Sequence, residues 1–450
     1  MARMFGTDGV RGIAGKKLDA QLAYKLGLAC AHVLTGEVHK AKILIGRDTR
    51  ISGDMLENAL VAGICSAGAE AQCLGIVPTP AIAHFTRAYG ADAGVVISAS
   101  HNSFEYNGIK FFNGQGYKLA DAIEDEIEEL VNNIETLPLC TGKEIGRRID
   151  IKNATKEYVE FLCSTINERL DGLKVVLDCA NGASFETAEA VMKKLGAEVY
   201  TYYNDPNGIN INDHCGSTDP ATLRKLVMER DADVGLAFDG DADRLIAVDE
   251  YGKIVDGDRI MAICAVDLKN RGLLKNDTLV TTIMSNIGLE IGLKEQGINI
   301  VKTGVGDRYV LEEMLKSGYS LGGEQSGHII FLDHNSTGDG VLSAIQLLSV
   351  MKRSGKKLSE LANVIEIYPQ VLIGAKVADE KKNDWKNIPE ITALIAEVEE
   401  KLEGDGRVLI RASGTEALVR VMIEGKDKRV IEEDAVRIAK LIESHLKEEA

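Results

Sequence analysis

One phrase occurs twice in this 450-residue sequence, and it sets strong limits on the fold. Residues 91–97 read Ala-Asp-Ala-Gly-Val-Val-Ile and lead into a polar turn, and residues 232–238 read Ala-Asp-Val-Gly-Leu-Ala-Phe and lead into an acidic one. A short apolar run bounded by turn residues is typical of a buried strand. The repetition therefore indicates tandem copies of one structural unit.

Each copy is preceded by a further apolar run that begins with lysine, at residues 42–45 and 174–177. A third, weaker copy runs from residues 279–282 to residues 322–328. Runs rich in Val and Ile alternate with helical patterns, which is typical of α/β domains with largely parallel sheets. Ligands bind at the ends of strands in open sheets of this kind, so each copy is expected to present a functional loop.

The pattern changes after Tyr368-Pro369. A long Glu/Lys-rich helix, a strand at 407–411, a strand at 418–423 and a final amphipathic helix predict an α+β domain. We therefore predict three tandem related α/β domains with mixed sheets, followed by a C-terminal α+β domain. The predicted ranges are 1–150, 151–252, 253–368 and 369–450.

The turn of the second copy contains three carboxylates at alternate positions, Asp239, Asp241 and Asp243. Alternate residues of an extended segment project the same way, so these oxygens can converge on one cation. Mg²⁺ and Ca²⁺ prefer such oxygen ligands. Arg244 follows directly, and because arginine binds phosphate through paired donors, it suggests that a phosphate is the ion's other ligand.

A calcium loop of the EF-hand type is the alternative for this segment. Counted from Asp239, the first, third and fifth positions are acidic, and Glu250 occupies the twelfth, where such loops have a bidentate glutamate. The sixth position needs glycine but holds Arg244, and the flanking segments have the patterns of strands rather than helices. These two mismatches disfavour the EF-hand.

The net charge of the chain is −17 and its pI is near 5.1. This acidity argues against nucleic acid or an anionic membrane as the main partner, because both need a basic face. No apolar stretch approaches the roughly 20 residues of a membrane span.

The eight cysteines include no Cys-x-x-Cys pair, which favours buried thiols in a reducing compartment. A cytoplasmic location is expected, and any phosphate must be bound by a local basic cluster.

The turn of the first copy, Ser98–Asn102, places Ser100 at a strand end, where a serine can act as a nucleophile or phosphate carrier. Turn serines more often cap helices or bond to the backbone. The sequence lacks a Gly-x-Ser-x-Gly elbow, which disfavours acyl transfer. Lys110 follows a few residues later, in the segment Asn107–Lys110.

The loop Arg411–Glu416 follows a predicted strand and combines an arginine, two hydroxyls and a glycine. This composition suits a phosphate cradle, although a plain hairpin connection is equally compatible with it. The candidate phosphate-binding residues are Arg411, Ser413, Gly414, Thr415 and Arg420.

The segment Gly322–His328 offers hydrogen-bonding groups for the hydroxyls of a sugar, and its Glu324 can also meet an ammonium group. Two other glycine-flanked loops present arginines, Arg11 and Arg308. Each loop alone is compatible with an ordinary surface turn. A metal site, a candidate phosphoserine, several arginines and a sugar-binding turn together predict phosphoryl transfer on a sugar phosphate.

Five motifs in this order, over the whole length, resemble those of the α-D-phosphohexomutase superfamily. They are Phe5–Gly12, Ser98–Asn102, Asp239–Arg244, Glu324–His328 and Arg411–Glu416. Ser98, Gln325 and the segment Cys215–Thr218 are most similar to the bacterial members that act on glucosamine phosphates. The resemblance implies a heart-shaped, four-domain isomerase with a central cleft. It implies that glucosamine 6-phosphate is interconverted with glucosamine 1-phosphate for amino-sugar nucleotide and cell-wall synthesis.

The resemblance also assigns roles to residues. Phosphorylated Ser100 carries the phosphoryl group, and one Mg²⁺ is bound by Asp239, Asp241, Asp243 and an oxygen of that group. A hexosamine bisphosphate is the primer and intermediate. Lys110 and His101 are the candidates for managing the proton of the sugar hydroxyl, and Arg11 and Arg244 flank the transferring phosphate. The expected substrate-binding residues are Arg244, Arg308, Glu324, Ser326 and His328.

The Arg411 loop and Arg420 are expected to bind the distant phosphate, in a mobile last domain hinged near residue 368. A homodimer is expected from family likeness alone. Two alternatives stay open at this point. A phosphoglucomutase or phosphomannomutase would differ only in the sugar, and a non-catalytic sugar-phosphate-binding protein would not need Ser100.

Overall fold

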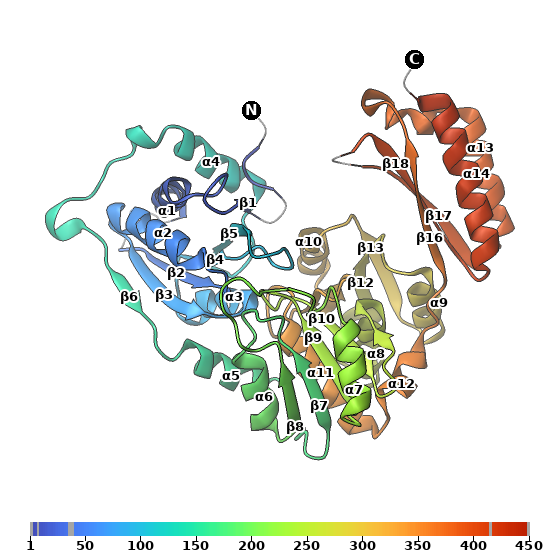
Figure 1. Ribbon diagram of the computed structural model, residues 1–450, viewed down its shortest axis with the longest axis horizontal. Helices are drawn as coiled ribbons and strands as arrows, with labels where there is room; N and C mark the ends of the chain where they lie inside the picture. The colour runs from blue at the N-terminus through green and yellow to red at the C-terminus, as the bar shows by residue number, and fades with distance from the viewer. Residues whose placement is uncertain (1–2, 7–8, 35–39, 414–415, 448–450) are drawn as a thin grey trace. The chain divides into compact units, whose positions relative to one another are not determined.

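The computed structural model describes residues 3–6, 9–34, 40–413 and 416–447 (Figure 1). The chain forms two compact units. The first contains residues 1–284 and 297–364, and the second contains residues 285–296 and 365–450.

The first sheet has six strands in the order β1-β5-β4-β2-β3-β6. Its central strand β2 pairs in parallel with β3 and β4, and β4 pairs antiparallel with β5. The bounds are β1 Val10–Ile13, β2 Lys42–Arg47, β3 Glu70–Ile76, β4 Ala93–Ile97, β5 Tyr106–Asn113 and β6 Arg148–Asp150. Every residue of β4 is buried, as its unbroken apolar run predicts for a strand covered on both faces.

Helices cover both faces of this sheet (Figure 1). α1 (Ala20–Leu34), α2 (Gly53–Ser66) and α4 (Asp121–Asn132) pack with Ile43 and Ile45 in one apolar core. α3 (Thr79–Ala88) lies on the opposite face, where Gly94 permits its close approach: a Cβ there would lie 2.8 Å from Ile82 Cγ2.

The second and third sheets repeat the pattern of the first. The second has the order β11-β10-β9-β7-β8 and the third β13-β12-β14-β15. Each has a parallel trio followed by an antiparallel hairpin, and in the second sheet β10 also pairs antiparallel with β11. Their bounds are β7 Lys174–Asp178, β8 Glu198–Tyr202, β9 Val234–Phe238, β10 Leu245–Asp249, β11 Ile254–Val255, β12 Thr278–Thr282, β13 Asn299–Thr303, β14 Leu321–Gly323 and β15 Ile329–Phe331. The tandem repeat predicted from the sequence is confirmed, including its weak third copy.

The functional loops occupy equivalent positions in the three repeats. Each connects the two strands of the antiparallel hairpin, at 98–105, 239–244 and 324–328. The turn after the central strand is also repeated. Asp48 Oδ1 accepts from the N–H of Arg50 at 3.0 Å, and Asp178 Oδ1 accepts from the N–H of Ala180 at the same distance. In the third repeat Thr282 Oγ1 accepts from the N–H of Met284.

Helix α11 (Gly340–Ser354) begins directly behind the acidic loop. Asp339 caps the helix by accepting from the N–H of Leu342, and the N–H of Gly340 donates to the carbonyl of Ala242 at 2.9 Å. A Cβ at Gly340 would lie 2.3 Å from the carbonyl oxygen of Arg244, so only glycine fits there. The remaining helices of the first unit are α5 Ala154–Ser164, α6 Thr187–Leu195, α7 Ala221–Glu229, α8 Gly257–Asn270, α10 Asp307–Ser317 and α12 Leu358–Leu361.

The second unit combines α9 (Ile287–Glu295) with a three-stranded antiparallel sheet and two helices. Its other elements are β16 Gln370–Lys376, α13 Pro389–Lys401, β17 Gly406–Ala412, β18 Leu418–Gly425 and α14 Lys428–Leu446. The two strands and two helices predicted for the tail are present, but β16 was not predicted. Only one of its residues is fully buried, so its apolar signal in the sequence is weak.

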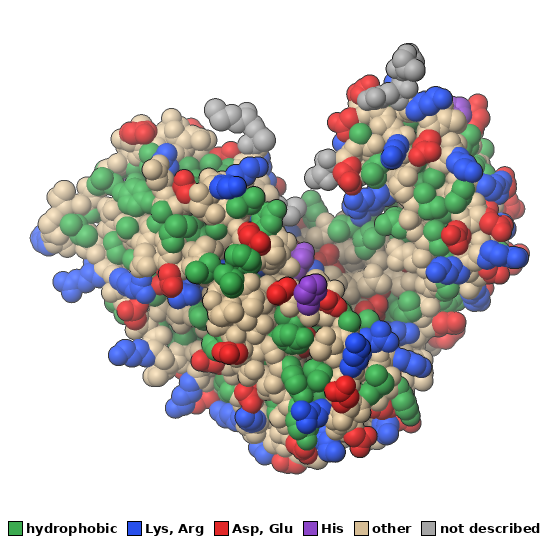
Figure 2. Space-filling model, in the orientation of Figure 1, with side chains coloured by type: hydrophobic (Ala, Val, Ile, Leu, Met, Phe, Trp, Pro, Cys, Tyr) green, Lys and Arg blue, Asp and Glu red, His purple; other side chains and the backbone are tan. Residues whose placement is uncertain are grey.

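Acidic and basic side chains are interspersed over the face of the molecule shown in Figure 2. Among the residues that the structure describes, no helix has both the length and the apolar character needed to cross a membrane.

Candidate active site

The acidic turn between β9 and β10 gathers three buried carboxylates. Asp239, Asp241 and Asp243 are 0%, 1% and 7% exposed, and each offers an oxygen within 4.8 Å of the others. Ala242 has a φ of +58°, which folds the turn tightly enough to bring the alternate side chains together. The predicted convergence of the three carboxylates is thus present in the structure.

The chemistry of this cluster fits a divalent cation. Among the described residues, Asp241 Oδ1 and Asp243 Oδ1 are buried and have no hydrogen-bond partner. Burial, followed by the charges of Asp243 and Asp241, raises the pKa of Asp239 well above its ordinary value. Buried carboxylates need a compensating charge, and hard cations take oxygen ligands of this kind. The site therefore suits Mg²⁺ or a similar ion.

Ser100 points its hydroxyl at this cluster. Its Oγ donates to Asp239 Oδ2 at 2.6 Å, and the residue is only 2% exposed. Its φ is +53°, a left-handed conformation that is unfavourable for a residue with a Cβ. The N–H of Ser100 donates to Ser98 Oγ, which in turn donates to Asp48 Oδ2 at 2.5 Å. The surrounding loop therefore maintains the turn that aims the hydroxyl.

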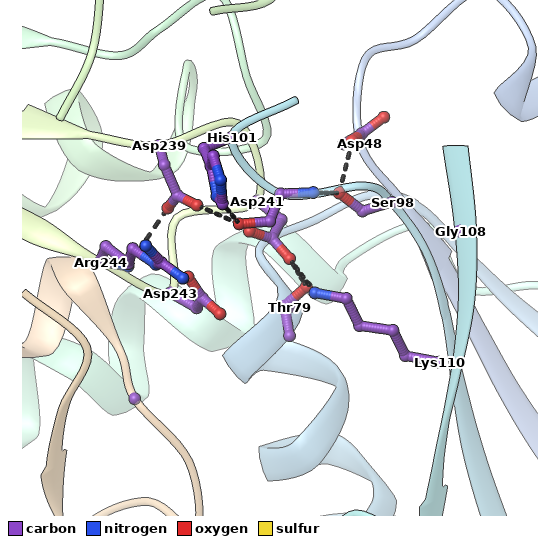
Figure 3. Close-up of polar contacts among 12 residues, drawn as sticks. Asp48, Thr79, Ser98, His101, Gly108, Lys110, Asp239, Asp241, Asp243 and Arg244 are labelled. Atoms are coloured by element: carbon purple, nitrogen blue, oxygen red, sulfur yellow. Dashed lines mark hydrogen bonds and ion pairs between the residues drawn. The ribbon is translucent and has the colours of Figure 1, made fainter. Parts of the chain in front are cut away.

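Lys110 and Thr79 contact the same oxygen of Asp241. Lys110 Nζ lies 2.7 Å from Asp241 Oδ2, and Thr79 Oγ1 donates to that oxygen at 2.7 Å (Figure 3). Burial alone would raise the pKa of Asp241, but the adjacent Lys110 ammonium lowers it below its ordinary value. Lys110 is itself 3% exposed and lies on β5, so a strand of the first sheet supplies a cation to the turn of the second.

His101 and Arg244 flank the serine and the carboxylates. His101 Nδ1 lies 3.4 Å from Ser100 Oγ. Burial, together with the charges of Arg244 and Arg11, lowers the pKa of His101, so its ring is neutral at pH 7 and can accept a proton. The N–H of Arg244 donates to Asp239 Oδ1, and its Nε lies 3.7 Å from Asp243 Oδ1.

The loop of the third repeat also reaches the acidic turn. His328 Nδ1 lies 3.3 Å from Asp243 Oδ2, and the N–H of Gly338 donates to His328 Nε2 at 3.0 Å. Burial alone would lower the pKa of His328, but the carboxylate of Asp243, followed by that of Asp307, raises it. Glu324 is half-buried and accepts from the N–H of Gly306, whereas Ser326 is exposed.

Arg308, a predicted substrate-binding residue, is paired with acidic side chains. Its guanidinium forms ion pairs with Asp121 at 2.5 Å and with Glu312 at 2.9 Å. The neighbouring Asp307 lies 3.3 Å from His328 Nε2 and pairs with Lys118 at 2.6 Å.

The predicted phosphate loop lies in the second unit. Arg411 on β17 is directly opposite Arg420 on β18, and both are exposed. Arg420 also forms an ion pair with Glu416, with Nη2 3.2 Å from Oε2. Ser413 is 5% exposed and its Oγ accepts from the N–H of Glu416. Gly414 and Thr415 lie outside the described residues.

Several residues of the site were not identified from the sequence. Thr79 and Asp307 each contact a predicted site residue, and Asp48 accepts a hydrogen bond from Ser98 in the loop of Ser100; all three follow or begin a regular element. Asp48 had a usable signal, because it closely follows the apolar run at 42–45, just as Ser98 follows the run at 91–97. For Thr79 and Asp307 the sequence contained no signal of a functional role, apart from their positions at the starts of helices.

Comparison with known proteins identifies the family of this chain. Four models of the phosphoglucomutase/phosphomannomutase family match the chain: alpha/beta/alpha domain I at residues 2–138, domain II at 156–252, domain III at 256–368 and the C-terminal domain at 372–441. Among solved structures, a phosphoglucomutase/phosphomannomutase family protein from Burkholderia thailandensis is 25% identical, with a TM-score of 0.82 over 99% of this chain and 98% of that one.

Full-length relatives are much closer in sequence. The phosphoglucosamine mutase of Acetivibrio thermocellus is 59% identical over 99% of this chain and 100% of its own length. That of Ruminiclostridium cellulolyticum is 60% identical with the same coverage. The chain therefore belongs to the phosphoglucosamine mutases, within the phosphoglucomutase/phosphomannomutase superfamily.

Proposed function

We propose that the chain interconverts glucosamine 6-phosphate and glucosamine 1-phosphate by passing a phosphoryl group through Ser100. One observation carries the proposal: a serine hydroxyl lies 2.6 Å from Asp239 within a buried cluster of three carboxylates. Full-length relatives that are about 60% identical and are named phosphoglucosamine mutases support the choice of reaction.

Bound by Asp239, Asp241, Asp243 and the phosphorylated Ser100, Mg²⁺ would neutralise charge on the transferring group, the main requirement of a loose phosphoryl-transfer transition state. In the first step the bond from phosphorus to Ser100 Oγ breaks, and a bond from phosphorus to a sugar hydroxyl oxygen forms. The hydroxyl proton passes through His101 or Lys110, and Ser100 Oγ receives a proton. The bisphosphate then turns over and returns its other phosphoryl group to Ser100.

The remaining residues are assigned to binding. Arg11 and Arg244 flank the reacting phosphate, where their charges stabilise it. Arg308, Glu324, Ser326 and His328 are assigned to the sugar, and Glu324 is the candidate reader of its ammonium group. Arg308 must exchange its ion pairs with Asp121 and Glu312 to do so.

The distant phosphate is assigned to Arg411, Ser413 and Arg420, with Gly414 and Thr415. Binding energy from this non-reacting group positions the reacting end. Three further points stay predictions: motion of the last domain about a hinge near residue 368, formation of a homodimer, and a cytoplasmic location.

A coupled assay tests the proposal. The Mg²⁺-loaded protein would be supplied with glucosamine 6-phosphate or glucose 6-phosphate, each primed with its bisphosphate. We expect much faster turnover of the amino sugar; comparable or reversed rates would indicate a broader hexose-phosphate mutase. We expect Ser100→Ala to abolish turnover and the phosphoryl mass on the protein, and Ser164→Ala, at an exposed serine of α5, to leave both unchanged. Unaltered activity of Ser100→Ala would overturn the phosphoserine mechanism.

A further inference from the structure

Arg50 is a fully buried arginine beside the loop that carries Ser100. It lies just after β2, and its side chain has no exposed surface. Its Nε donates to Asp48 Oδ2 at 2.9 Å, and its backbone N–H donates to Asp48 Oδ1. A buried guanidinium is unfavourable unless all its donors have hydrogen-bond acceptors. The acceptors of its remaining N–H groups therefore indicate the role of Arg50.

The rest of the guanidinium is directed at the backbone of a single loop. Its Nη2 donates to the carbonyls of Ser100 at 2.9 Å and Asn102 at 2.8 Å. Its Nη1 donates to the carbonyls of Ser103 and, at 3.1 Å, Tyr106. The loop between β4 and β5 therefore folds its carbonyl groups around one planar cation, whose fork of donors has a fixed geometry.

A second side chain binds the same carbonyls from another domain. Asn212, in the segment after β8, donates through Nδ2 to the carbonyls of Ser100 and Asn102, both at 2.9 Å. The acidic turn closes against this point. A Cβ at Gly240 would lie 2.6 Å from the Ser100 carbonyl oxygen and 2.8 Å from Asn212 Nδ2. The Ser100 carbonyl is thus the place where the first sheet, the second sheet and the metal turn meet.

We infer that Arg50 and Asn212 are positioning residues that hold the Ser100 backbone in its left-handed turn and thereby keep Oγ directed at the metal cluster. The inference rests on the proposed role of Ser100. The physical reason is the φ of +53° at a residue that has a Cβ: this conformation persists only where the surroundings over-determine it. Four hydrogen bonds from two side chains fix the carbonyls of Ser100 and Asn102 and supply that constraint.

The inference makes a specific kinetic prediction. Within the described contacts, neither Arg50 nor Asn212 touches Ser100 Oγ or the three carboxylates, so loosening the loop should leave sugar binding intact and slow the transfer step. Phosphoryl transfer depends on alignment, and displacements near 1 Å can cost about 10²-fold in rate. The expected signature is a fall in kcat with little change in KM.

Asn212→Ala is the principal variant, and Asn210→Ala is its matched control. Asn210 lies in the same segment, but among the residues described its side chain bonds only within that segment, to the carbonyl of Asp205 and the N–H of Asn207. We expect Asn212→Ala to lower kcat and the single-turnover transfer rate by about 10- to 100-fold, with KM within about twofold of the parent. The ³¹P resonance of phosphorylated Ser100 should shift and broaden, whereas Asn210→Ala should match the parent in every measurement.

Arg50→Lys supplies an independent variant, because lysine retains the charge beside Asp48 but cannot bind four carbonyls at once. It should show a larger fall in kcat. If Arg50→Lys does not fold, the measurements on Asn212→Ala alone test the inference. A normal kcat for Asn212→Ala, or a loss of activity that only follows the loss of folded protein, would overturn the inference while Ser100→Ala remains inactive. An active Ser100→Ala would overturn the proposed mechanism and the inference with it.

Discussion

Lys110 Nζ lies 2.7 Å from Asp241 Oδ2, although the two residues are 131 positions apart, one on β5 of the first sheet and the other in the turn between β9 and β10 of the second. Both side chains are almost completely buried, at 4% and 1% exposed. A buried ion pair of this kind holds the acidic turn against β5, because each charge would be strongly unfavourable alone.

Replacing Lys110 by methionine should therefore be damaging in two ways. It leaves Asp241 uncompensated, which should lower the unfolding free energy by about 3–5 kcal/mol. It also removes a candidate for proton handling, which should lower kcat by about 10²-fold or more. Thermal unfolding and the coupled assay measure the two effects, and Lys42→Met, at the exposed start of β2, is the control. Parent-like values for both would contradict the assignment of Lys110 to the site.

The acidic turn should lose its ion when one carboxylate is neutralised. Asp243→Asn retains the shape of the side chain but removes a charged ligand, so Mg²⁺ affinity should fall at least about 100-fold. Titration calorimetry with Mg²⁺ measures this directly. Asp231→Asn, at an exposed position just before β9, should bind as the parent does. Equal affinities in the two variants would remove Asp243 from the metal site.

His84 should make the first unit sensitive to acid. It stacks on Phe161 with ring centroids 3.8 Å apart, and burial, followed by the charge of Arg87, lowers the pKa of His84 to about 4. The unfolded chain binds this proton near pH 6.5, so stability is present above that pH and is lost as the pH falls towards about 4.

His84→Phe should remove roughly 2 kcal/mol of this acid dependence while retaining the aromatic stack. Melting temperatures at pH 7 and pH 4.5 measure the change, which should be smaller in the variant than in the parent. His214→Asn, at a histidine whose side chain is 91% exposed, serves as control. An unchanged acid dependence in His84→Phe would show that other groups account for it.

Glu424 should hold α9 within the second unit. Its buried Oε2 accepts from the N–H of Ile287 at 2.9 Å and from Arg407 Nε at 2.7 Å. Glu424→Ala would leave these donors without their acceptor, so the second unit should lose about 3–5 kcal/mol. Hydrogen exchange of residues 287–295 should accelerate. Glu424→Gln should be milder, the exposed Glu432→Ala should be neutral, and unchanged exchange in Glu424→Ala would argue against this role.

Much of the fold was predictable because its signals are local. The alternation of Asp239, Asp241 and Asp243 implied convergence of their side chains, and the apolar run at 91–97 implied a buried strand. The repeated phrase predicted equivalent units, and the three sheets have the same hairpin at the same place. These features depend on side-chain periodicity and turn chemistry, which neighbouring residues set.

The unpredicted features depend on partners far away in the chain. The sequence around Arg50 does not distinguish a surface arginine from a buried one, because its acceptors are the carbonyls of residues 100–106. Thr79 becomes part of the site only through Asp241, and α9 joins the second unit through Glu424. The sequence alone thus determined the strands of the repeated units, the repeat itself and the residue types of the site, but not β16. Tertiary structure decided which buried charges pair and which carbonyls they hold, because burial and long-range geometry set those free energies.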